Sequence, residues 1–284
     1  IWRSREHSRK MSETVFDEHS GIVYRRWAAA EPRAALLLVH GLGSYGGRWS
    51  FFAEFLLKEG ISSYAIDLRG FGETPGLKGH VGSLGVYYED IKNLRAIIAR
   101  DCPGRKIFLC GESMGGLISF TAACLAPGLF DGLICLAPSF RNRLKVKYTD
   151  YLRMFFFRVF APRKQMLLPF TAQMCTRDSA YQQVMDSDKR EIKVATPVLL
   201  TNILLAEARA GALSKKLSCP VLFQVPLDLD NFVDPEGTRN IFRALRIPDK
   251  KIIFYPLMLH SLSVDLGREE VFNDILDWLN GRIR

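Results

Sequence analysis

Short apolar runs alternate with segments of helical periodicity from residue 34 onward. The apolar runs, which we predict to be strands, cover residues 35–40, 62–67, 106–110, 132–137, 221–225 and 251–255. The segments between them, which we predict to be helices, include residues 48–60, 87–100, 238–247 and 268–279. Strands that alternate with helices form a parallel sheet covered by helices on both faces. The sequence therefore predicts an α/β protein.

This alternation is interrupted once, between Pro138 and about Ala212. The interruption contains no predicted strand and has the pattern of several helices with aromatic and basic faces. Long connections without regular structure are rare in compact domains, so we expect a helical cap here. The predicted parts are a first core segment, a cap or lid, a second core segment and a short N-terminal extension, over residues 11–139, 140–212, 213–284 and 1–10.

The segment GESMGG, residues 111–116, directly follows a predicted strand and precedes a helix-compatible run. A G-x-S-x-G segment in this context is typical of a nucleophile elbow. Its turn strains the serine backbone, and Gly111 and Gly115 leave the space that the turn requires. We predict Ser113 as a nucleophile; the alternative is an ordinary helix start with an N-cap serine.

A second glycine-rich segment, GLGSYG at residues 41–46, has two interpretations. It follows a predicted strand, and Asp67 ends the next one about twenty residues later, as in the dinucleotide fingerprint of a nicotinamide oxidoreductase. Alternatively, the H-G-L-G segment from His40 is a loop that donates one backbone N–H to an oxyanion hole, and Asp67 lies in a polar turn. The second interpretation alone requires G-x-S-x-G together with a later acid and histidine.

The order of residues along the chain selects one histidine. Among the five, His260 follows the last predicted strand and precedes the last predicted helix. The general base of a hydrolase with this elbow lies there, because it must face the elbow across neighbouring strand ends. We therefore predict His260 as the base; the alternative is a loop histidine that caps the last helix. The earlier histidines are His7, His19, His40 and His80.

The loop after residues 221–225 contains three aspartates that are candidates for orienting this base. Asp234 precedes a proline at a predicted helix start, so an N-cap role is sufficient for it. Asp228 is favoured by its position near the strand end, whereas Asp230 is favoured by the apolar pair that follows it and docks the loop. We prefer Asp230 and keep Asp228 as the alternative.

Several motifs combine into the pattern of a known family. They are H-G-L-G, D-L-R-G-F-G, G-H-V, G-E-S-M-G-G and D-N-F-V-D, followed by a late histidine before W-L. Over roughly residues 20–281, this combination resembles the monoacylglycerol lipase and lysophospholipase group of serine α/β-hydrolases. The resemblance implies the α/β-hydrolase fold, with a mostly parallel sheet, helices on both faces and a helical cap over residues 140–212 that carries the acyl-chain tunnel.

The resemblance also implies the roles of single residues. Ser113 would be the nucleophile, His260 the general base and Asp230 the orienting acid, because family members carry this acid in a D-x-h-V loop in which h is apolar. The backbone N–H groups of Leu42 and Met114 would form the oxyanion hole. No metal and no cofactor are implied, and no nucleic acid is expected as a partner.

The implied reaction is hydrolysis of a carboxylic ester through an acyl-enzyme, with monoacylglycerols, lysophospholipids or short esters as substrates. A thioesterase or acyltransferase with the same triad is one alternative, and a catalytically impaired binding protein of the same fold is another. The impaired binding protein is motivated by two departures from the family pattern. Val225-Pro226 stands where the family usually has a glycine after the strand before the acid, and residues 257–259 stand where it usually has glycine and a small or aromatic residue before the histidine. The added bulk is expected beside the triad, where it would tighten the alcohol side, shift the loops or weaken catalysis.

Basic charge is concentrated in the predicted cap. The chain has a formal net charge of +9, and residues 141–164 contain eight basic residues against one acid, Asp150. Such a patch attracts phosphates or anionic head groups. Residues 151–170 combine these charges with aromatic side chains, so we hypothesise that the segment lies on lipid surfaces. The alternatives are a solvated basic face and aromatic side chains packed against the core.

The remaining composition predicts a cytoplasmic protein with peripheral contact at an anionic membrane surface. No apolar run approaches the length of a membrane span, and the first thirty residues lack a signal-peptide core. The six cysteines form no C-x-x-C pair, so we expect neither a disulfide framework nor a zinc site.

Overall fold

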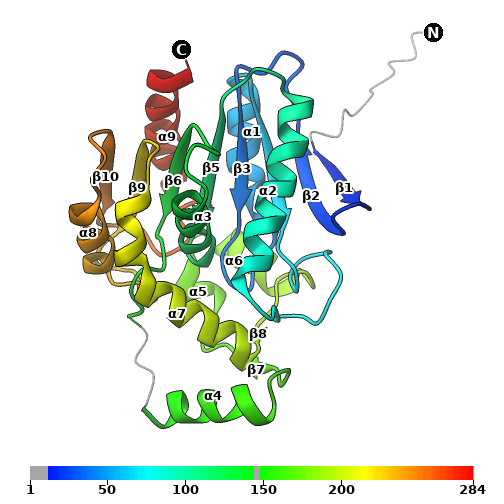
Figure 1. Ribbon diagram of the computed structural model, residues 1–284, viewed down its shortest axis with the longest axis vertical. Helices are drawn as coiled ribbons and strands as arrows, with labels where there is room; N and C mark the ends of the chain where they lie inside the picture. The colour runs from blue at the N-terminus through cyan, green and yellow to red at the C-terminus, as the bar shows by residue number, and fades with distance from the viewer. Residues whose placement is uncertain (1–11, 144–147, 284) are drawn as a thin grey trace.

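A sheet of eight strands forms the centre of the structure, a computed structural model that describes residues 12–143 and 148–283. The strand order is β1-β2-β4-β3-β5-β6-β9-β10 (Figure 1). Strands β3 to β6, β9 and β10 pair in parallel, whereas β1 and β2 pair antiparallel with their neighbours. The bounds are β1 (Glu13–Asp17), β2 (Ile22–Trp27), β3 (Ala34–Val39), β4 (Ile61–Asp67), β5 (Ile107–Glu112), β6 (Gly132–Leu136), β9 (Val221–Pro226) and β10 (Lys250–Tyr255).

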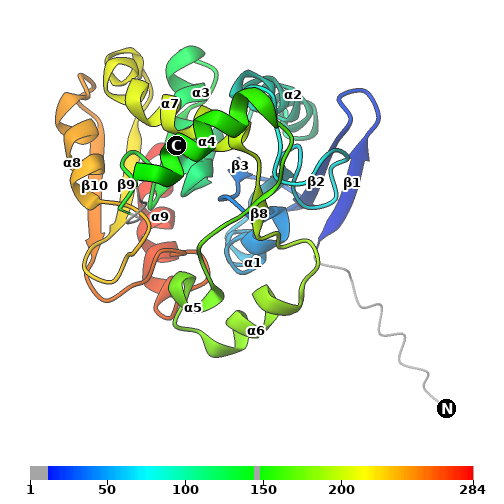
Figure 2. The same ribbon diagram turned by 90° about the horizontal axis from the view of Figure 1, so that it is seen from below.

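Helices cover both faces of this sheet (Figure 2). One face packs against α1 (Ser50–Lys58) and α9 (Arg268–Ile283), and the other against α2 (Leu84–Asp101), α3 (Met114–Leu125) and α8 (Pro235–Ala244). Side chains along β3 alternate between the two cores, and all of them are buried. This double burial explains why β3 is apolar at every position. The predicted fold, a mostly parallel sheet with helices on both faces, is confirmed.

The N-terminal strands β1 and β2 are not predicted by the sequence pattern, which has no strand before residue 34. The pattern fails for a physical reason. Strand β2 contains Arg25 in its middle, yet Arg25 is buried because its guanidinium pairs with Asp67 at 2.6 Å. A charged residue with a partner more than forty positions away hides the apolar pattern of a buried strand.

The segment between β6 and β9 is mainly helical and extends beyond one end of the sheet (Figure 1). Its helix α7 contacts both α3 of the core and α4, so it joins the segment to the core. The segment also contains a short antiparallel pair of strands, so the expectation of no strand there is wrong; two-residue strands leave no periodic pattern in a sequence. The elements are α4 (Tyr148–Phe160), β7 (Met166–Leu167), α5 (Ala172–Cys175), α6 (Ser179–Ser187), β8 (Val194–Ala195) and α7 (Pro197–Leu213).

The remaining short elements are the 3-10 helices η1 (Gly46–Trp49) and η2 (Ser214–Lys216). In the described part of the chain, no helix combines the length and the apolar character needed to cross a membrane. The N-terminal extension predicted over residues 1–10 lies outside the described residues.

Candidate active site

Ser113 lies on a sharp turn between β5 and α3, with φ 58° and ψ −121°. A non-glycine residue with positive φ costs about 1–3 kcal/mol and persists where its surroundings hold it. Here the Ser113 N–H donates to the Leu136 carbonyl at 2.9 Å, and the Ser113 carbonyl accepts from the Ser139 N–H at 3.1 Å. The Ser113 side chain makes no capping hydrogen bond to α3, so it is not an ordinary N-cap serine.

The glycines around Ser113 are required by space. A Cβ atom on Gly111 would lie 2.3 Å from the Gly115 carbonyl oxygen, and a Cβ atom on Gly115 would lie 2.2 Å from the Val39 carbonyl oxygen. On the facing loop, a Cβ atom on Gly41 would approach the Ser113 Cβ to 3.2 Å. The two glycines of the G-x-S-x-G segment therefore allow the backbones of β3, β5 and α3 to approach closely.

A chain of hydrogen bonds connects Ser113 with His260 and Asp230. The Ser113 Oγ lies 2.7 Å from His260 Nε2, and His260 Nδ1 lies 2.8 Å from an Asp230 carboxylate oxygen. The other Asp230 oxygen accepts from the backbone N–H groups of Phe232 at 2.7 Å and Val233 at 3.2 Å. These bonds fix the carboxylate against the imidazole, and a histidine held in this way is suited to proton transfer with a serine hydroxyl.

The pKa of His260 is raised above its ordinary value of 6.5. Burial works in the opposite direction, but it is outweighed by the charge and hydrogen bond of Asp230 and by the charge of Glu112. Asp230 therefore stabilises the protonated imidazole, which is the form that a general base reaches after taking a proton.

The two other aspartates of this loop lie elsewhere. Asp228 is exposed, and the aspartate that bonds the His260 imidazole is Asp230. Asp234 accepts a hydrogen bond from the Glu236 N–H at 3.0 Å and so caps α8, as the sequence predicts. The apolar pair after Asp230 accounts for the difference, because Val233 is buried and holds the loop against the site.

Two residues that line the cavity beside Ser113 have backbone N–H groups that are candidates for binding an oxyanion. Among the described residues, no hydrogen-bond acceptor is found for the N–H of Leu42 or of Met114, and both residues line the same cavity as Ser113. Met114 is the first residue of α3, where a helix leaves its N–H groups free. Such paired donors are suited to an oxyanion.

A cavity of about 750 Å³ is lined by Ser113 and His260. This volume is within the range of small-molecule sites, which are mostly apolar with a few polar groups. Its apolar walls include Leu42, Met114, Met154, Phe157, Met166, Leu168, Phe170, Leu200, Ile203, Leu204, Phe232 and Val233. Its polar groups include Arg48, Glu112, Ser139, Asn142, Glu207 and Ser261.

The helix α4 has apolar side chains on two faces. On its inner face, Tyr151, Met154 and Phe157 line the cavity. The outer face of α4 is exposed and consists of Tyr148, Leu152, Phe155, Phe156, Val159 and Phe160. The alternative that the aromatic side chains of this segment pack inward therefore holds only for the inner face of α4. Lys145 and Lys147 of the basic run lie outside the described residues.

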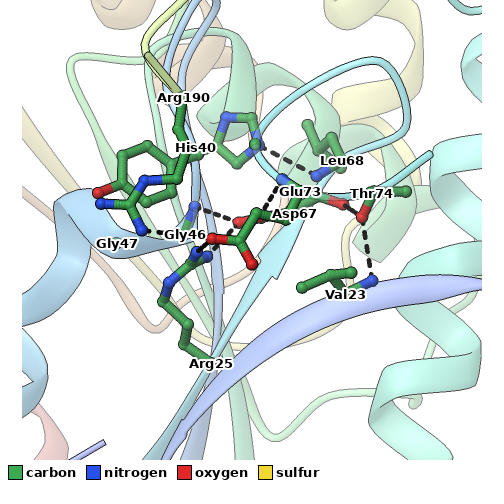
Figure 3. Close-up of polar contacts among 12 residues, drawn as sticks. Val23, Arg25, His40, Gly46, Gly47, Asp67, Leu68, Glu73, Thr74 and Arg190 are labelled. Atoms are coloured by element: carbon green, nitrogen blue, oxygen red, sulfur yellow. Dashed lines mark hydrogen bonds and ion pairs between the residues drawn. The ribbon is translucent and has the colours of Figure 1, made fainter. Parts of the chain in front are cut away.

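Asp67 is buried and holds the loop after β3 (Figure 3). Its carboxylate pairs with Arg25 and accepts from the N–H groups of Gly46 at 2.7 Å and Glu73 at 2.8 Å. The sequence places Asp67 in a polar turn; it is instead the last residue of β4, and its buried carboxylate binds the turn that follows through the Glu73 N–H. A carboxylate with no exposed surface cannot reach a ribose, so the dinucleotide interpretation of GLGSYG also fails.

A buried ion pair connects the loop after β3 to the segment before β8. The Arg48 guanidinium bonds both carboxylate oxygens of Glu191, one of them at 3.2 Å, and each side chain is less than a tenth exposed. Close by, the buried Glu112 accepts from the Ser263 N–H at 3.0 Å and from its hydroxyl at 2.8 Å. Burial raises the pKa of Glu112 although these hydrogen bonds oppose the change.

Sequence reasoning does not single out Arg48, Glu112 or Glu191. The one available signal is Glu112, a charged residue between Gly111 and Ser113 in the G-x-S-x-G segment. In the described part of the chain, no group of histidine, cysteine and acidic residues is arranged to hold a metal ion.

The bulky residues before His260 and before the aspartate loop lie away from the cavity. Val225 and Pro226 are buried in the last positions of β9. Leu257 is exposed, whereas Met258 packs in the core beneath α1 and α9. None of residues 225–226 or 257–259 is among the described residues that line the cavity, so their added bulk does not narrow it. The sequence could not show which side of each loop these side chains occupy.

A strained serine follows a central parallel strand and is hydrogen-bonded to a histidine, which in turn bonds a buried aspartate. This arrangement defines a serine α/β-hydrolase. Comparison with known families agrees with this class. Residues 30–267 match the family described as serine aminopeptidase, S33, and the chain belongs to this family.

Individual relatives cover most of the chain. Human monoglyceride lipase is 25% identical over 264 residues, which are 88% of this chain and 84% of that protein. Phospholipase YtpA of Bacillus subtilis is 24% identical over 253 residues, 87% of this chain and 95% of that protein. The crystal structure of the Paleococcus ferrophilus monoacylglycerol lipase matches with a TM-score of 0.84 and 25% identity, over 92% of this chain and 99% of that one. The resemblance to the monoacylglycerol lipase group is confirmed.

Proposed function

We propose that the protein is a serine carboxylic-ester hydrolase that cleaves monoacylglycerols through an acyl-enzyme. Ser113 is the nucleophile, His260 the general base and acid, and Asp230 the acid that orients it. The observation that carries this proposal is the hydrogen-bonded chain from Ser113 through His260 to Asp230 beside a largely apolar cavity. Similarity to a monoglyceride lipase over most of the chain supports the substrate.

In the proposed mechanism, the Ser113 oxygen attacks the ester carbonyl carbon while His260 Nε2 takes the hydroxyl proton. The N–H groups of Leu42 and Met114 stabilise the oxyanion. His260 returns the proton to the alcohol, which leaves, and an acyl-Ser113 ester remains. Water then attacks this ester as His260 takes a proton from it; the fatty acid leaves when His260 returns the proton to Ser113.

The charges near His260 favour an uncharged head group. The leaving alcohol lies near His260, which must protonate it. Arg48 lines the cavity and acts electrostatically on His260. Its guanidinium is already paired with Glu191, and the Glu112 carboxyl also interacts with the guanidinium. A paired guanidinium offers little attraction to a phosphate. This supports monoacylglycerols over anionic lysophospholipids as substrates.

We propose residues 140–212 as the cap of the cavity and the outer face of α4 as a surface that rests on lipid. Between half and three quarters of the surface of Phe156, Val159, Phe160 and Tyr148 is exposed, and Leu167 is 84% exposed. The exposed basic residues Arg153, Arg163 and Lys164 are close in sequence to this face, and Arg153 and Lys164 lie over the ring of Phe157 at the edge of the cavity. Apolar groups flanked by basic ones suit the interface of an anionic bilayer.

The membrane proposal is tested with vesicles that contain phosphatidylserine. Replacing Phe156 and Phe160 together by serine is expected to weaken co-sedimentation by about ten-fold or more, because two apolar rings no longer enter the interface. Phe16→Ser is the matched control, since Phe16 is 53% exposed on β1, away from α4. Equal binding by all three proteins would count against the proposal.

The catalytic proposal is tested by hydrolysis of a monoacylglycerol chain-length series. Ser113→Ala is expected to lower kcat by at least about a thousand-fold. Ser119→Ala is the control, because its hydroxyl is buried in α3 with no partner among the described residues. Equal rates from wild type and Ser113→Ala would reject the nucleophile. Faster turnover of acyl thioesters, or acyl transfer to an added alcohol, would favour a thioesterase or an acyltransferase.

A further inference from the structure

Glu207 interrupts the apolar face that α7 presents to the cavity. Leu200, Ile203 and Leu204 line the cavity, and Glu207 follows one turn later on the same face and also lines it. The helix α7 contacts α4, whose inner face lines the same cavity. A carboxyl group therefore continues the apolar face of α7 into the cavity, at a position where the pattern along the helix predicts another leucine.

The Glu207 carboxyl is weakly compensated. Its Oε1 accepts one hydrogen bond, from the Ser139 hydroxyl at 2.7 Å. Burial raises the pKa of Glu207 to about 7, opposed by the Ser139 hydrogen bond. An apolar residue in this place would avoid the cost of burying a carboxylate. Such costly groups concentrate at functional sites.

The position of Ser139 places this pair close to the nucleophile. The Ser139 N–H donates to the Ser113 carbonyl at 3.1 Å, while the Ser139 side chain bonds Glu207. The proposed mechanism uses neither side chain. A carboxyl group has about four acceptor positions and donates as well when it is protonated, so Glu207 retains capacity for a further partner.

We propose that Glu207 and Ser139 form a subsite that binds a hydroxyl group on the substrate's acyl chain, near its carbonyl carbon. The inference rests on the proposed ester-hydrolase function. A hydroxyl both donates and accepts, which matches a carboxyl beside a serine hydroxyl. The substrate class is esters of α- or β-hydroxy fatty acids, and the subsite adds to the apolar contacts that any acyl chain makes.

The test compares ethyl esters, because ethanol brings no hydroxyl of its own once esterified. Four acyl chains of equal length carry no hydroxyl, an α-hydroxyl, a β-hydroxyl or an ω-hydroxyl. The wild type is expected to show kcat/KM about ten-fold or more higher for the α- or β-hydroxy ester than for the plain ester, as one hydrogen bond to a carboxyl allows. The ω-hydroxy ester is expected to show no such gain.

Variants at the subsite are expected to change this ratio. Glu207→Leu completes the leucine face of α7 and is expected to remove the preference, whereas Glu207→Gln keeps a group that bonds Ser139 and is expected to retain part of it. Ser139→Ala is expected to weaken it. Glu89→Leu on α2 is the matched control, since the Glu89 side chain is 66% exposed. An unchanged ratio in Glu207→Leu would overturn the proposal.

Two further measurements separate the possible failures. Labelling of Ser113 by a fluorophosphonate is followed for every variant. A wild type that is neither labelled nor active on any ester would reject the proposed function. Labelled wild type that shows no preference for a hydroxy ester would reject the subsite alone. Glycerol esters of the plain chain form the second arm. If Glu207→Leu instead lowers the preference for glycerol over ethyl esters, the hydroxyl belongs to the alcohol and the acyl-chain assignment is wrong.

Discussion

The two walls of the cavity are built in different ways. On the sheet side, Ser113, His260 and Asp230 are held by backbone hydrogen bonds and by glycines that leave no room for a side chain. On the cap side, Met154 is the buried side chain of α4, and much of the helix faces outward. In the proposed function, the chemistry, which needs sub-ångström positioning, takes place on the rigid wall, and the apolar substrate enters along the other wall.

The largest expected effect concerns the rigid wall. Asp230→Asn is expected to lower kcat/KM by about 10⁴-fold, because the amide favours the wrong tautomer of His260. Asp228→Asn is the matched control in the same loop and is expected to change the rate less than about two-fold, since Asp228 is exposed. Ester kinetics of both variants measure this; comparable losses would show that Asp230 has no special role.

The ion pair that connects the two walls is expected to give the next largest effect. Glu191→Gln leaves the buried Arg48 guanidinium without its counter-charge, which costs about 3–5 kcal/mol of unfolding free energy. Asp186→Asn breaks an exposed pair with Lys193 in the same segment and is expected to cost less than about 1 kcal/mol. Denaturant titration compares them, and equal costs would contradict the buried pairing.

Two glycines sharpen the comparison of the walls further. Gly115→Ala places a Cβ atom against the Val39 carbonyl oxygen and is expected to destabilise the protein by about 1–3 kcal/mol. Gly211→Ala on α7 meets no atom within 4 Å and is expected to stabilise it by about 0.5–1 kcal/mol, as alanine does inside a helix. Thermal unfolding measures the change in stability of both variants. A stabilising Gly115→Ala would argue against close packing of the turn around Ser113.

The smallest expected effect is on pH dependence. General-base catalysis needs neutral His260, so kcat/KM is expected to rise with pH and to reach half its plateau above pH 6.5, because the pKa of His260 is raised. In Asp230→Asn the main cause that raises this pKa is lost, and the midpoint of the residual activity is expected to move to lower pH. An unchanged midpoint would show that Asp230 does not raise the pKa of His260.

The rigid wall is also the part that sequence predicts well. Ser113 lies in a motif whose spacing follows from local sterics, and His260 is selected by its order along the chain. The preference for Asp230 over Asp228 matches the loop that the structure describes. These inferences need contacts between neighbouring residues or between adjacent strand ends, which a parallel sheet imposes.

The remaining features depend on partners that are distant in sequence. The sequence pattern favours a turn role for Asp67, and only the structure shows Arg25 of β2 paired with it. The position of Glu207 in the cavity depends on how α7 packs, and the outward direction of Leu257 depends on the loop before His260. The sequence shows that these residues exist, whereas tertiary packing determines what each one contacts.

The most direct test of the central claim is to map the site of covalent reaction. Wild-type protein is treated with a fluorophosphonate, digested and analysed by mass spectrometry. The account predicts one adduct, on the peptide that contains Ser113, together with loss of ester hydrolysis in proportion to labelling. An adduct on another residue, or hydrolysis that continues undiminished when Ser113 is fully labelled, would contradict it.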